Sequence, residues 1–221
     1  DIASHLRYTA PMSEDTSSRL EARASVVILA GGQSRRLGCD KSLLPVGGEP
    51  LLARTVHRLA PLADDLIVVT NHSDRYEALD LPVRLVPDER PGVGSLMGIY
   101  SGLRATRHPL ALAVGCDMPF LNVPLLRYML GLAPGYDVVI PRLEGLMEPL
   151  HAVYRETCLG PMETLLAAGR RQIIAFFDQV RVRYVGEEEI DRFDPKRLSF
   201  VNVNTPEDWA EVQAVLNDRG L

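Results

Sequence analysis

Short apolar runs rich in β-branched residues alternate along the chain with longer stretches of mixed apolar and polar residues. The short runs predict strands at residues 26–30, 66–70, 83–86, 110–115, 137–141, 149–154, 180–184 and 200–203. The mixed stretches predict helices near residues 50–60, 74–79, 95–106, 123–131, 156–168, 171–177 and 206–217. Strands that are apolar throughout and alternate with helices are typical of a parallel sheet covered on both faces. The pattern therefore predicts an α/β fold.

The same pattern divides the chain into two parts. Residues 1–24 are polar, lack a clear period and contain a cluster of Ser, Thr, Glu and Asp, so we expect a flexible N-terminal tail. Residues 25–221 contain no repeat, low-complexity tract or linker, and we expect them to form one domain. Ligands of open parallel sheets bind outside the carboxyl ends of the strands. We therefore expect the loops after the first four predicted strands to converge on the functional site.

Composition narrows the class of protein. A chain of 221 residues with 46% hydrophobic residues and a net charge of −5 fits one soluble domain with a full core. The acidic balance argues against a nucleic-acid platform, which would normally show a basic patch. No window offers the roughly 18 uninterrupted apolar residues of a membrane span. The three cysteines are widely spaced and favour neither a disulfide framework nor a zinc site, so we expect a cytoplasmic protein.

The segment after the first predicted strand carries the strongest chemical signal. Residues 29–41 read Leu-Ala-Gly-Gly-Gln-Ser-Arg-Arg-Leu-Gly-Cys-Asp-Lys. Glycines let backbone N–H groups approach phosphate oxygens, and cationic side chains neutralise those oxygens. Only two of the 24 basic residues are lysine, and Lys41 ends this segment, where a compact mobile charge suits a phosphate tail. The segment predicts nucleotide binding, although it has neither the P-loop spacing nor G-x-G-x-x-G.

An acidic residue, Asp117, stands just past the apolar run at 110–115. This position suits Mg²⁺, a hard ion that takes one or two carboxylates and leaves its other positions to phosphate and water. The alternative is that Asp117 only caps the next helix. Pro119 and Phe120 separate it from the helical run, and Asn122 is the better cap, so the sequence favours the metal.

The pattern L-A-G-G-x-S-x-R-x-G-x-D-K resembles the signature loop of nucleotidyltransferases, most closely that of the molybdenum cofactor guanylyltransferases. The resemblance extends through C-D-x-P at 116–119, E-P-L-H at 148–151 and N-x-N-T-P-E-D at 202–208, and spans roughly residues 25–215. It implies a single Rossmann-like three-layer α/β/α domain of the nucleotide-diphospho-sugar transferase type with a mostly parallel sheet. It also implies transfer of GMP from GTP to the terminal phosphate of molybdopterin, with or without bound molybdenum, and release of pyrophosphate.

The resemblance assigns roles to residues of these motifs. The nucleotide-binding residues would be Leu29, Ala30, Gly31, Gly32 and Ser34. Lys41 and Arg36 would contact the triphosphate and the departing pyrophosphate, and Asp117 would hold Mg²⁺, the implied cofactor. Arg35 is a weaker candidate than Arg36, because the family pattern leaves its position free. The acceptor phosphate is already anionic, so catalysis would rest on positioning and charge neutralisation rather than on a general base.

Two polar residues follow the second and third predicted strands. Asn71 and Asp88 are, from the residues alone, as readily turn residues as ligands. The resemblance implies that they recognise the base and the ribose, and Asp88 could accept from guanine or from ribose hydroxyls. The stretch 92–99 opens a predicted helix, with Ser95 where the family commonly has proline. It is equally readily a structural helix entry or a segment that packs closely against a base or phosphate.

The end of the chain carries an asparagine pair. On a strand, Asn202 and Asn204 would share one face, and the resemblance implies contact with the acceptor pterin or the water shell of the metal. Thr205 is expected to cap the last helix, with Pro206 at its first position. His151 could bond the acceptor or be a core histidine with satisfied hydrogen bonds, and we give it no catalytic role. The charge run 187–189 indicates only a solvated face.

Three alternatives remain open. A cytidylyl- or sugar-phosphate nucleotidyltransferase is the nearest, but the cytidylate branch commonly has Ala-Gly where this chain has Gly31 and Gly32. A non-catalytic nucleotide-binding regulator would be expected to lack Lys41 or Asp117, and both are present. An unrelated structural module would not need the glycines. The implied partners are GTP and molybdopterin, together with molybdoenzymes or proteins of the cofactor pathway, and we expect a monomer or weak oligomer.

Overall fold

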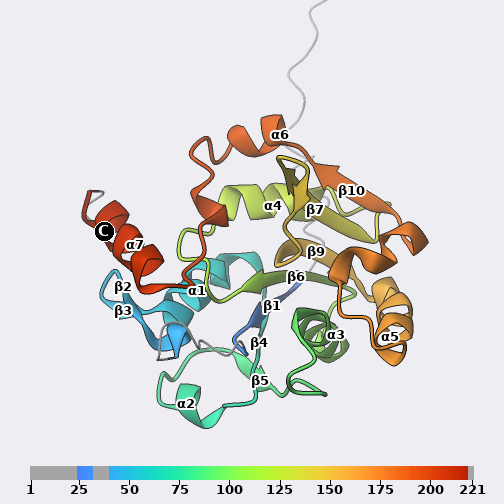
Figure 1. The fold of residues 1–221 in the computed structure, drawn as a ribbon, viewed down its shortest axis with the longest axis horizontal. Helices are drawn as coiled ribbons and strands as arrows, with labels where there is room; N and C mark the ends of the chain where they lie inside the picture. The colour runs from blue at the N-terminus through green and yellow to red at the C-terminus, as the bar shows by residue number, and fades with distance from the viewer. Residues whose placement is uncertain (1–23, 32–39, 219–221) are drawn as a thin grey trace, which may run out of the picture.

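The computed structural model describes residues 24–31 and 40–218, and a mostly parallel sheet runs through its centre (Figure 1). The order across the sheet is β10 (Val182–Val185), β7 (Val138–Leu143), β9 (His151–Arg155), β6 (Leu110–Gly115), β1 (Ser25–Leu29), β4 (Asp65–Val69) and β5 (Arg84–Val86), with β8 (Leu146–Met147) paired to β7. β9 is antiparallel to β6 and β7, whereas β1 pairs in parallel with β4 and β6. The predicted α/β fold is confirmed.

Helices cover both faces of the sheet (Figure 1). They are α1 (Leu51–Leu59), α2 (Asp74–Glu77), α3 (Ser95–Ala105), α4 (Val123–Gly131), α5 (Leu159–Ala167), α6 (Glu187–Asp191) and α7 (Pro206–Asp218). On one face, α1 and α4 pack with Val26 and Ile28 of β1, and on the other face α3 and α5 share a core with Val27. Because successive side chains of a strand point to opposite faces, a strand between two helical layers must be apolar throughout.

Most predicted elements are confirmed. The strand at 110–115 and the helix at 123–131 have the predicted bounds, and six further predicted strands are present with shifted ends. The predicted helix at 171–177 is a 3₁₀ helix, Ile173–Gln179. The sequence interpretation missed the two-residue strands β2 (Pro45–Val46), β3 (Glu49–Pro50) and β8, and the short helix α6. The missed strands are too short to show an alternating pattern.

The predicted strand at 200–203 is wrong. A 3₁₀ turn, Leu198–Phe200, ends there, and the following residues join no sheet. Val203 is buried in an apolar cluster with Val212 and Leu216 of α7, so its hydrophobicity reflects burial under a helix rather than strand pairing. The backbone N–H of Val203 donates to the carbonyl oxygen of Asp117 at 2.9 Å. This bond holds the C-terminal segment against the end of β6.

The charge run 187–189 is also not a simple solvated face. Glu189 accepts from the Tyr128 hydroxyl and from the Arg183 guanidinium, each at 2.6 Å, and a Glu187 oxygen lies 2.7 Å from Arg197. These bonds fasten α6 to α4 and β10.

At the other end of the described chain, Ala24 is only 2% exposed, although the sequence interpretation placed it in the tail. Residues 1–23 of that tail lie outside the described residues.

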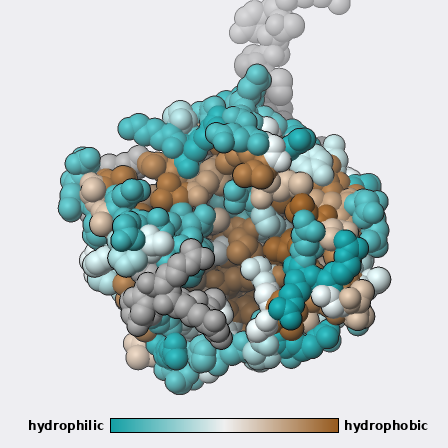
Figure 2. Space-filling model, in the orientation of Figure 1, coloured by the Kyte–Doolittle hydropathy of each residue, from teal (hydrophilic) through white to brown (hydrophobic). Residues whose placement is uncertain are grey.

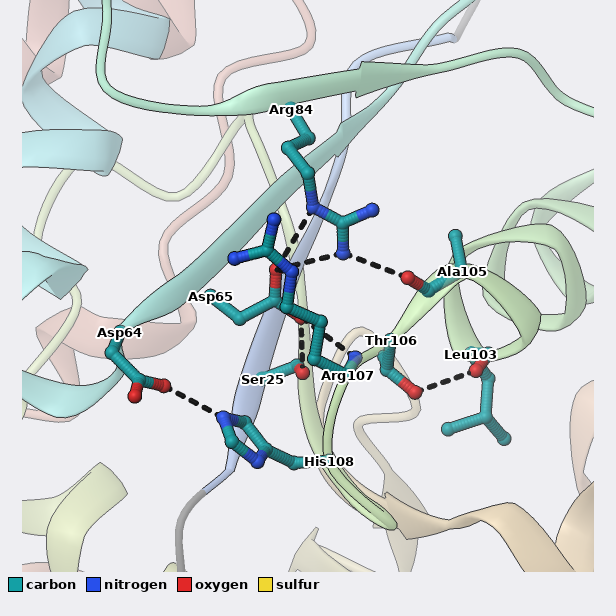
Figure 3. Close-up of polar contacts among 9 residues, drawn as sticks. All are labelled: Ser25, Asp64, Asp65, Arg84, Leu103, Ala105, Thr106, Arg107 and His108. Atoms are coloured by element: carbon teal, nitrogen blue, oxygen red, sulfur yellow. Dashed lines mark hydrogen bonds and ion pairs between the residues drawn. The ribbon is translucent and has the colours of Figure 1, made fainter.

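A buried carboxylate anchors the amino ends of the central strands, opposite the expected site (Figure 3). Asp65 at the start of β4 accepts from the Ser25 hydroxyl at 2.5 Å and from the Arg84 guanidinium at 2.7 and 3.0 Å. The backbone N–H of Arg107 donates to it at 2.9 Å. Burial alone would raise the pKa of Asp65, but these hydrogen bonds outweigh it and lower the pKa.

In residues 24–31 and 40–218, no helix has the length and hydropathy of a membrane span.

Candidate active site

A cavity of about 610 Å³ opens at the carboxyl ends of β1, β4, β5 and β6. Its volume lies in the range of small-molecule sites. On the face drawn in Figure 2, the surface is hollowed near the centre, and apolar side chains gather in the hollow with hydrophilic ones around it. The loops after the first four predicted strands converge here, as the sequence predicts. The lining residues are Leu29, Gly31, Lys41, Val69, Thr70, Asn71, His72, Asp88, Pro91, Gly92, Gly94, Ser95, Gly98, Gly115, Asp117 and Leu150.

One end of the cavity holds an ion pair. Lys41 Nζ lies 2.6 Å from Asp117 Oδ2, and both side chains are about one-sixth exposed, at 15% and 17%. Lys41 Nζ also donates to Asn204 Oδ1 at 3.3 Å. The pair brings together a cation from the segment after β1 and an anion from the loop after β6. Each partner neutralises the charge of the other.

Gly115, the last residue of β6, gives the Asp117 carboxylate its position. A Cβ at Gly115 would collide with Asp117 Oδ1. The carboxylate therefore folds back over the end of the strand, where a side chain would otherwise stand. The neighbouring Cys116 is buried, and burial raises the pKa of its thiol to about 12. Cys116 is thus a neutral packing group rather than a nucleophile.

Asn71 and Asp88 line the other end of the cavity and also hold its loops. Asn71 Oδ1 accepts from the backbone N–H of Asp88 at 3.1 Å, and Asp88 Oδ1 accepts from the backbone N–H of Arg90 at 3.0 Å. Burial raises the pKa of the Asp88 carboxyl, although the Arg90 N–H works against this shift. Each residue retains further hydrogen-bonding capacity toward the cavity. Asn71 and Asp88 therefore each stabilise a turn and also line the cavity, so both roles considered from the sequence are present at each residue.

The glycine-rich segment is described only at its two ends. Leu29 and Gly31 line the cavity, whereas Ala30 is buried and its N–H donates to Val69 O at 3.0 Å. A Cβ at Gly31 would come no nearer than 4.0 Å to Val69 O, so packing within the described chain does not require glycine there. The missing side chain instead leaves room at the cavity wall. Gly32, Ser34, Arg35 and Arg36 lie outside the described residues.

The asparagine pair is split. Asn204 contacts Lys41, whereas the Asn202 side chain donates locally to Phe200 O at 3.2 Å. The two do not share one face of a strand, because no strand forms there. Thr205 does cap α7: its hydroxyl accepts from the N–H of Asp208 at 3.1 Å. Asn122 likewise caps α4, accepting from Leu125 N at 3.0 Å, as predicted.

His151 lies in the core, but the hydrogen-bonding capacity of its ring is not satisfied by the described residues. It is fully buried, and neither ring nitrogen has a hydrogen-bond partner in the described part of the chain. Its ring packs against Phe200 with a centroid separation of 4.8 Å. Burial lowers the pKa of His151 to about 4. The interpretation as a core histidine is confirmed, and the assumption that its hydrogen bonds are made is wrong.

The site residues predicted from the sequence do not include six that line the cavity: Val69, Thr70, His72, Pro91, Gly115 and Leu150. Thr70 and His72 flank Asn71, and the position of Asn71 at a strand end was the available signal. Leu150 precedes β9, and only its place in the E-P-L-H motif distinguishes it. An apolar residue in a loop carries no chemical signal of its own.

An acid and a lysine that meet at the carboxyl ends of a parallel sheet, beside a glycine-lined cavity, are the arrangement of a nucleotidyltransferase. The family model of the MobA-like NTP transferase domain matches residues 26–183. Probable molybdenum cofactor guanylyltransferases of Chloroflexus aggregans and Pelotomaculum thermopropionicum are 42% and 38% identical over 89% and 87% of this chain and 97% and 93% of theirs. The chain therefore belongs to the molybdenum cofactor guanylyltransferase family of MobA-like nucleotidyltransferases.

Solved structures agree on the fold. Molybdopterin-guanine dinucleotide biosynthesis protein A from Archaeoglobus fulgidus superposes with a TM-score of 0.77 at 28% identity and covers 88% of this chain and 99% of its own. The 2-C-methyl-D-erythritol 4-phosphate cytidylyltransferase of Thermus thermophilus superposes with a TM-score of 0.65 at 18% identity, with 88% and 99% covered. The second likeness shows that this fold also serves a chain whose name specifies another nucleotide.

Proposed function

We propose that this protein transfers GMP from GTP to the terminal phosphate of molybdopterin in a reducing cytoplasm. An oxygen of the acceptor phosphate attacks the α-phosphorus of GTP, and the bond from that phosphorus to the oxygen bridging to the β-phosphate breaks. Pyrophosphate leaves with that oxygen, and a phosphoanhydride joins the guanylyl group to the acceptor. The acceptor oxygen is already anionic, so no proton has to be removed from it. Catalysis is then positioning and charge neutralisation.

The observation that carries this proposal is the Lys41–Asp117 pair at the end of the cavity. A lysine beside an acid, both partly open to the cavity, offers a cation for a triphosphate and an anion for a counter-ion. Asn71 and Asp88, at the opposite end, offer amide and carboxylate groups suited to the polar edge of a base or to ribose hydroxyls. The order β6-β1-β4-β5 separates these two pairs along the sheet edge, an arrangement that suits a nucleotide with its base at one end and its phosphates at the other.

The donor set near Lys41 fits a divalent metal. Asp117 supplies a carboxylate and Asn204 an amide oxygen, both hard ligands suited to Mg²⁺. The described residues contain no group of three or more His, Cys, Asp or Glu side chains that could hold a metal alone. A metal held by Asp117 would therefore depend on phosphate oxygens for other ligands, and would bind together with the nucleotide. When bound, it would neutralise charge on the phosphates.

The test is pyrophosphate release with Mg²⁺ and each of the four NTPs, with and without molybdopterin. We expect turnover only with GTP and molybdopterin together. A pocket that hydrogen-bonds the polar edge of one base selects against another, because the groups of the pocket would then lose their partners. Equal turnover with CTP would refute guanine selection, and turnover without molybdopterin would refute the acceptor.

Two variants test the ion pair. Asp117→Asn keeps the shape but removes the charge, and should nearly abolish turnover, since each ~1.4 kcal/mol of lost stabilisation is a tenfold loss of rate. Lys41→Ala should weaken GTP binding more than GMP binding, measured by calorimetry. Lys196→Ala is the matched control, because it removes the only other lysine and that residue is exposed. Equal losses for GTP and GMP in Lys41→Ala would refute the phosphate assignment.

A further inference from the structure

A buried hydroxyl lies between the two described ends of the glycine-rich segment. Tyr76 of α2 is 3% exposed, and its hydroxyl oxygen is 3.1 Å from Asp40 Oδ2 and 3.4 Å from the carbonyl oxygen of Ala30. Both acceptors lie within hydrogen-bond distance of this one hydroxyl, and the carboxylate oxygen is the nearer of the two. Burial raises the pKa of Tyr76 to about 12, so the hydroxyl stays a donor. One side chain from outside the segment thus contacts it just before residues 32–39 and just after them.

Asp40 turns this contact into a constraint on Lys41. Its Oδ1 accepts from the backbone N–H of Ser42 at 3.1 Å, which caps the 3₁₀ helix Lys41–Leu43. Its Oδ2 accepts from Tyr76 and from Arg75 Nη1, the latter at 3.2 Å. The carboxylate therefore joins α2 to the backbone on both sides of Lys41. None of these bonds involves the Lys41 ammonium itself.

The following residue completes the network. The Ser42 hydroxyl lies 3.3 Å from Cys116 Sγ, and both groups are buried. Cys116 is the direct neighbour of Asp117. The backbone of Lys41 is thus fixed from α2 through Asp40 and from Cys116, just after β6, through Ser42. The Lys41 side chain lies 2.6 Å from Asp117. A lysine side chain loses much rotamer freedom when held in one place, so a fixed backbone reduces what remains to be ordered.

We propose that Tyr76 and Asp40 are positioning residues for Lys41 in the nucleotidyl transfer reaction. Neither residue lines the cavity, and both act through the backbone that carries the lysine. The inference rests on the proposed function, in which Lys41 contacts the triphosphate. Its physical basis is that a small displacement of a charge aimed at a reacting group lowers the rate steeply, by as much as ~100-fold for 1 Å.

The first variant is Tyr76→Phe, which removes one oxygen and leaves the buried ring in place. We expect kcat for pyrophosphate release with GTP, Mg²⁺ and molybdopterin to fall roughly tenfold. GTP should bind more weakly in calorimetry while GMP binding stays unchanged, because only the outer phosphates reach Lys41. Tyr128→Phe is the matched control: it also removes a tyrosine–carboxylate bond, to Glu189, but lies away from the cavity. It should leave kcat and both affinities as in the wild type.

A double-mutant cycle separates positioning through Lys41 from a general structural effect. In the Lys41→Ala background, Tyr76→Phe should cause no further loss of GTP affinity or rate, because the group it positions is gone. Asp40→Asn serves as a second entry into the cycle if Tyr76→Phe does not fold. It retains the oxygen that caps Ser42 and loses the charge that attracts Arg75. It should lower kcat with the same dependence on Lys41.

The outcomes are distinct. Wild-type kinetics in Tyr76→Phe, or in Asp40→Asn where that variant replaces it, would overturn this inference. Equal losses with and without Lys41 would also overturn it while leaving the proposed function intact. No effect of Lys41→Ala itself on GTP affinity or rate would instead overturn the proposed role of Lys41, and the positioning role with it. A loss that appears only when Lys41 is present supports both.

Discussion

The burial of His151 predicts how the free energy of unfolding changes with pH. The ring is fully buried on β9, has no hydrogen-bond partner among the described residues, and has a pKa of about 4 against the ordinary 6.5. Burial is the main cause, and the nearby carboxylate of Asp194 opposes it only in part. As pH falls, the unfolded chain binds a proton at this residue first. Stability from this group is therefore complete above pH 6.5, declines as pH falls toward 4, and changes no further below that.

The size of the effect follows from the two pKa values. Protonation of the unfolded chain alone costs the folded state about 2 kcal/mol between pH 7 and pH 5, and about 3 kcal/mol in full. For a domain of this size, 2 kcal/mol corresponds to a fall in Tm of roughly 4–8 °C. Other groups titrate in the same interval. The measured quantity must therefore be the difference between the wild type and a variant that lacks the imidazole.

His151→Leu is that variant. We expect it to remove about 2 kcal/mol of the stability loss seen between pH 7 and pH 5 in urea unfolding. It should also be more stable than the wild type at pH 7.5, because two buried ring nitrogens without partners are removed. His72→Gln is the control, because it removes an exposed imidazole and leaves the buried one in place. Equal losses of stability on acidification in the wild type and in His151→Leu would refute the reasoning.

Three further predictions follow from close contacts and buried charge. Gly115→Ala should displace the Asp117 carboxylate and lower kcat at least tenfold with little change in Tm, since the collision involves only that flexible side chain. Gly102→Ala should destabilise the fold by about 1–3 kcal/mol in urea unfolding, because the new methyl would enter the packed face between α3 and β1. Gly160→Ala is the contrasting case: its new methyl meets no atom within 4 Å, and the substitution should stabilise the fold by up to ~1 kcal/mol. Asp65→Asn should lower the free energy of unfolding by about 2 kcal/mol at pH 7, and the difference from the wild type should shrink as pH falls through the carboxyl range.

The central sheet was predictable because its signal is local and strong. β6 is buried at all six positions, and a short run that is apolar on both faces is typical of a central strand where strands alternate with helices. The segment at 200–203 shows the limit of the same reasoning. Its apolar residues are buried by α7 rather than by neighbouring strands, and the sequence does not distinguish these two ways of burying Val203.

The location of the site in the fold could be predicted from the sequence, whereas the contacts between its side chains could not. The rule that ligands bind at the carboxyl ends of parallel strands correctly predicted that Lys41, Asn71, Asp88 and Asp117 would line one cavity. It did not predict that Asn204 would reach Lys41 across 163 positions of sequence. The backbone bond between Val203 and Asp117 holds the segment that carries this asparagine against the site, and only the family resemblance of the N-x-N-T-P-E-D motif pointed to that place.

Polar residues at strand and helix ends either cap the backbone or face a site, and the donor of the hydrogen bond that each side chain accepts distinguishes the two roles. Asp40, Asn122 and Thr205 each accept from a backbone N–H two or three positions along the chain, which is the capping bond. In the described part of the chain, the Asp117 carboxylate accepts from the Lys41 ammonium and from no backbone N–H. Among the described residues, the charge of this carboxylate is therefore balanced by a lysine side chain rather than by backbone N–H groups. Under the proposed function, Mg²⁺ arriving with the triphosphate would take the place of the Lys41 ammonium at this carboxylate, and the lysine would then contact the phosphates.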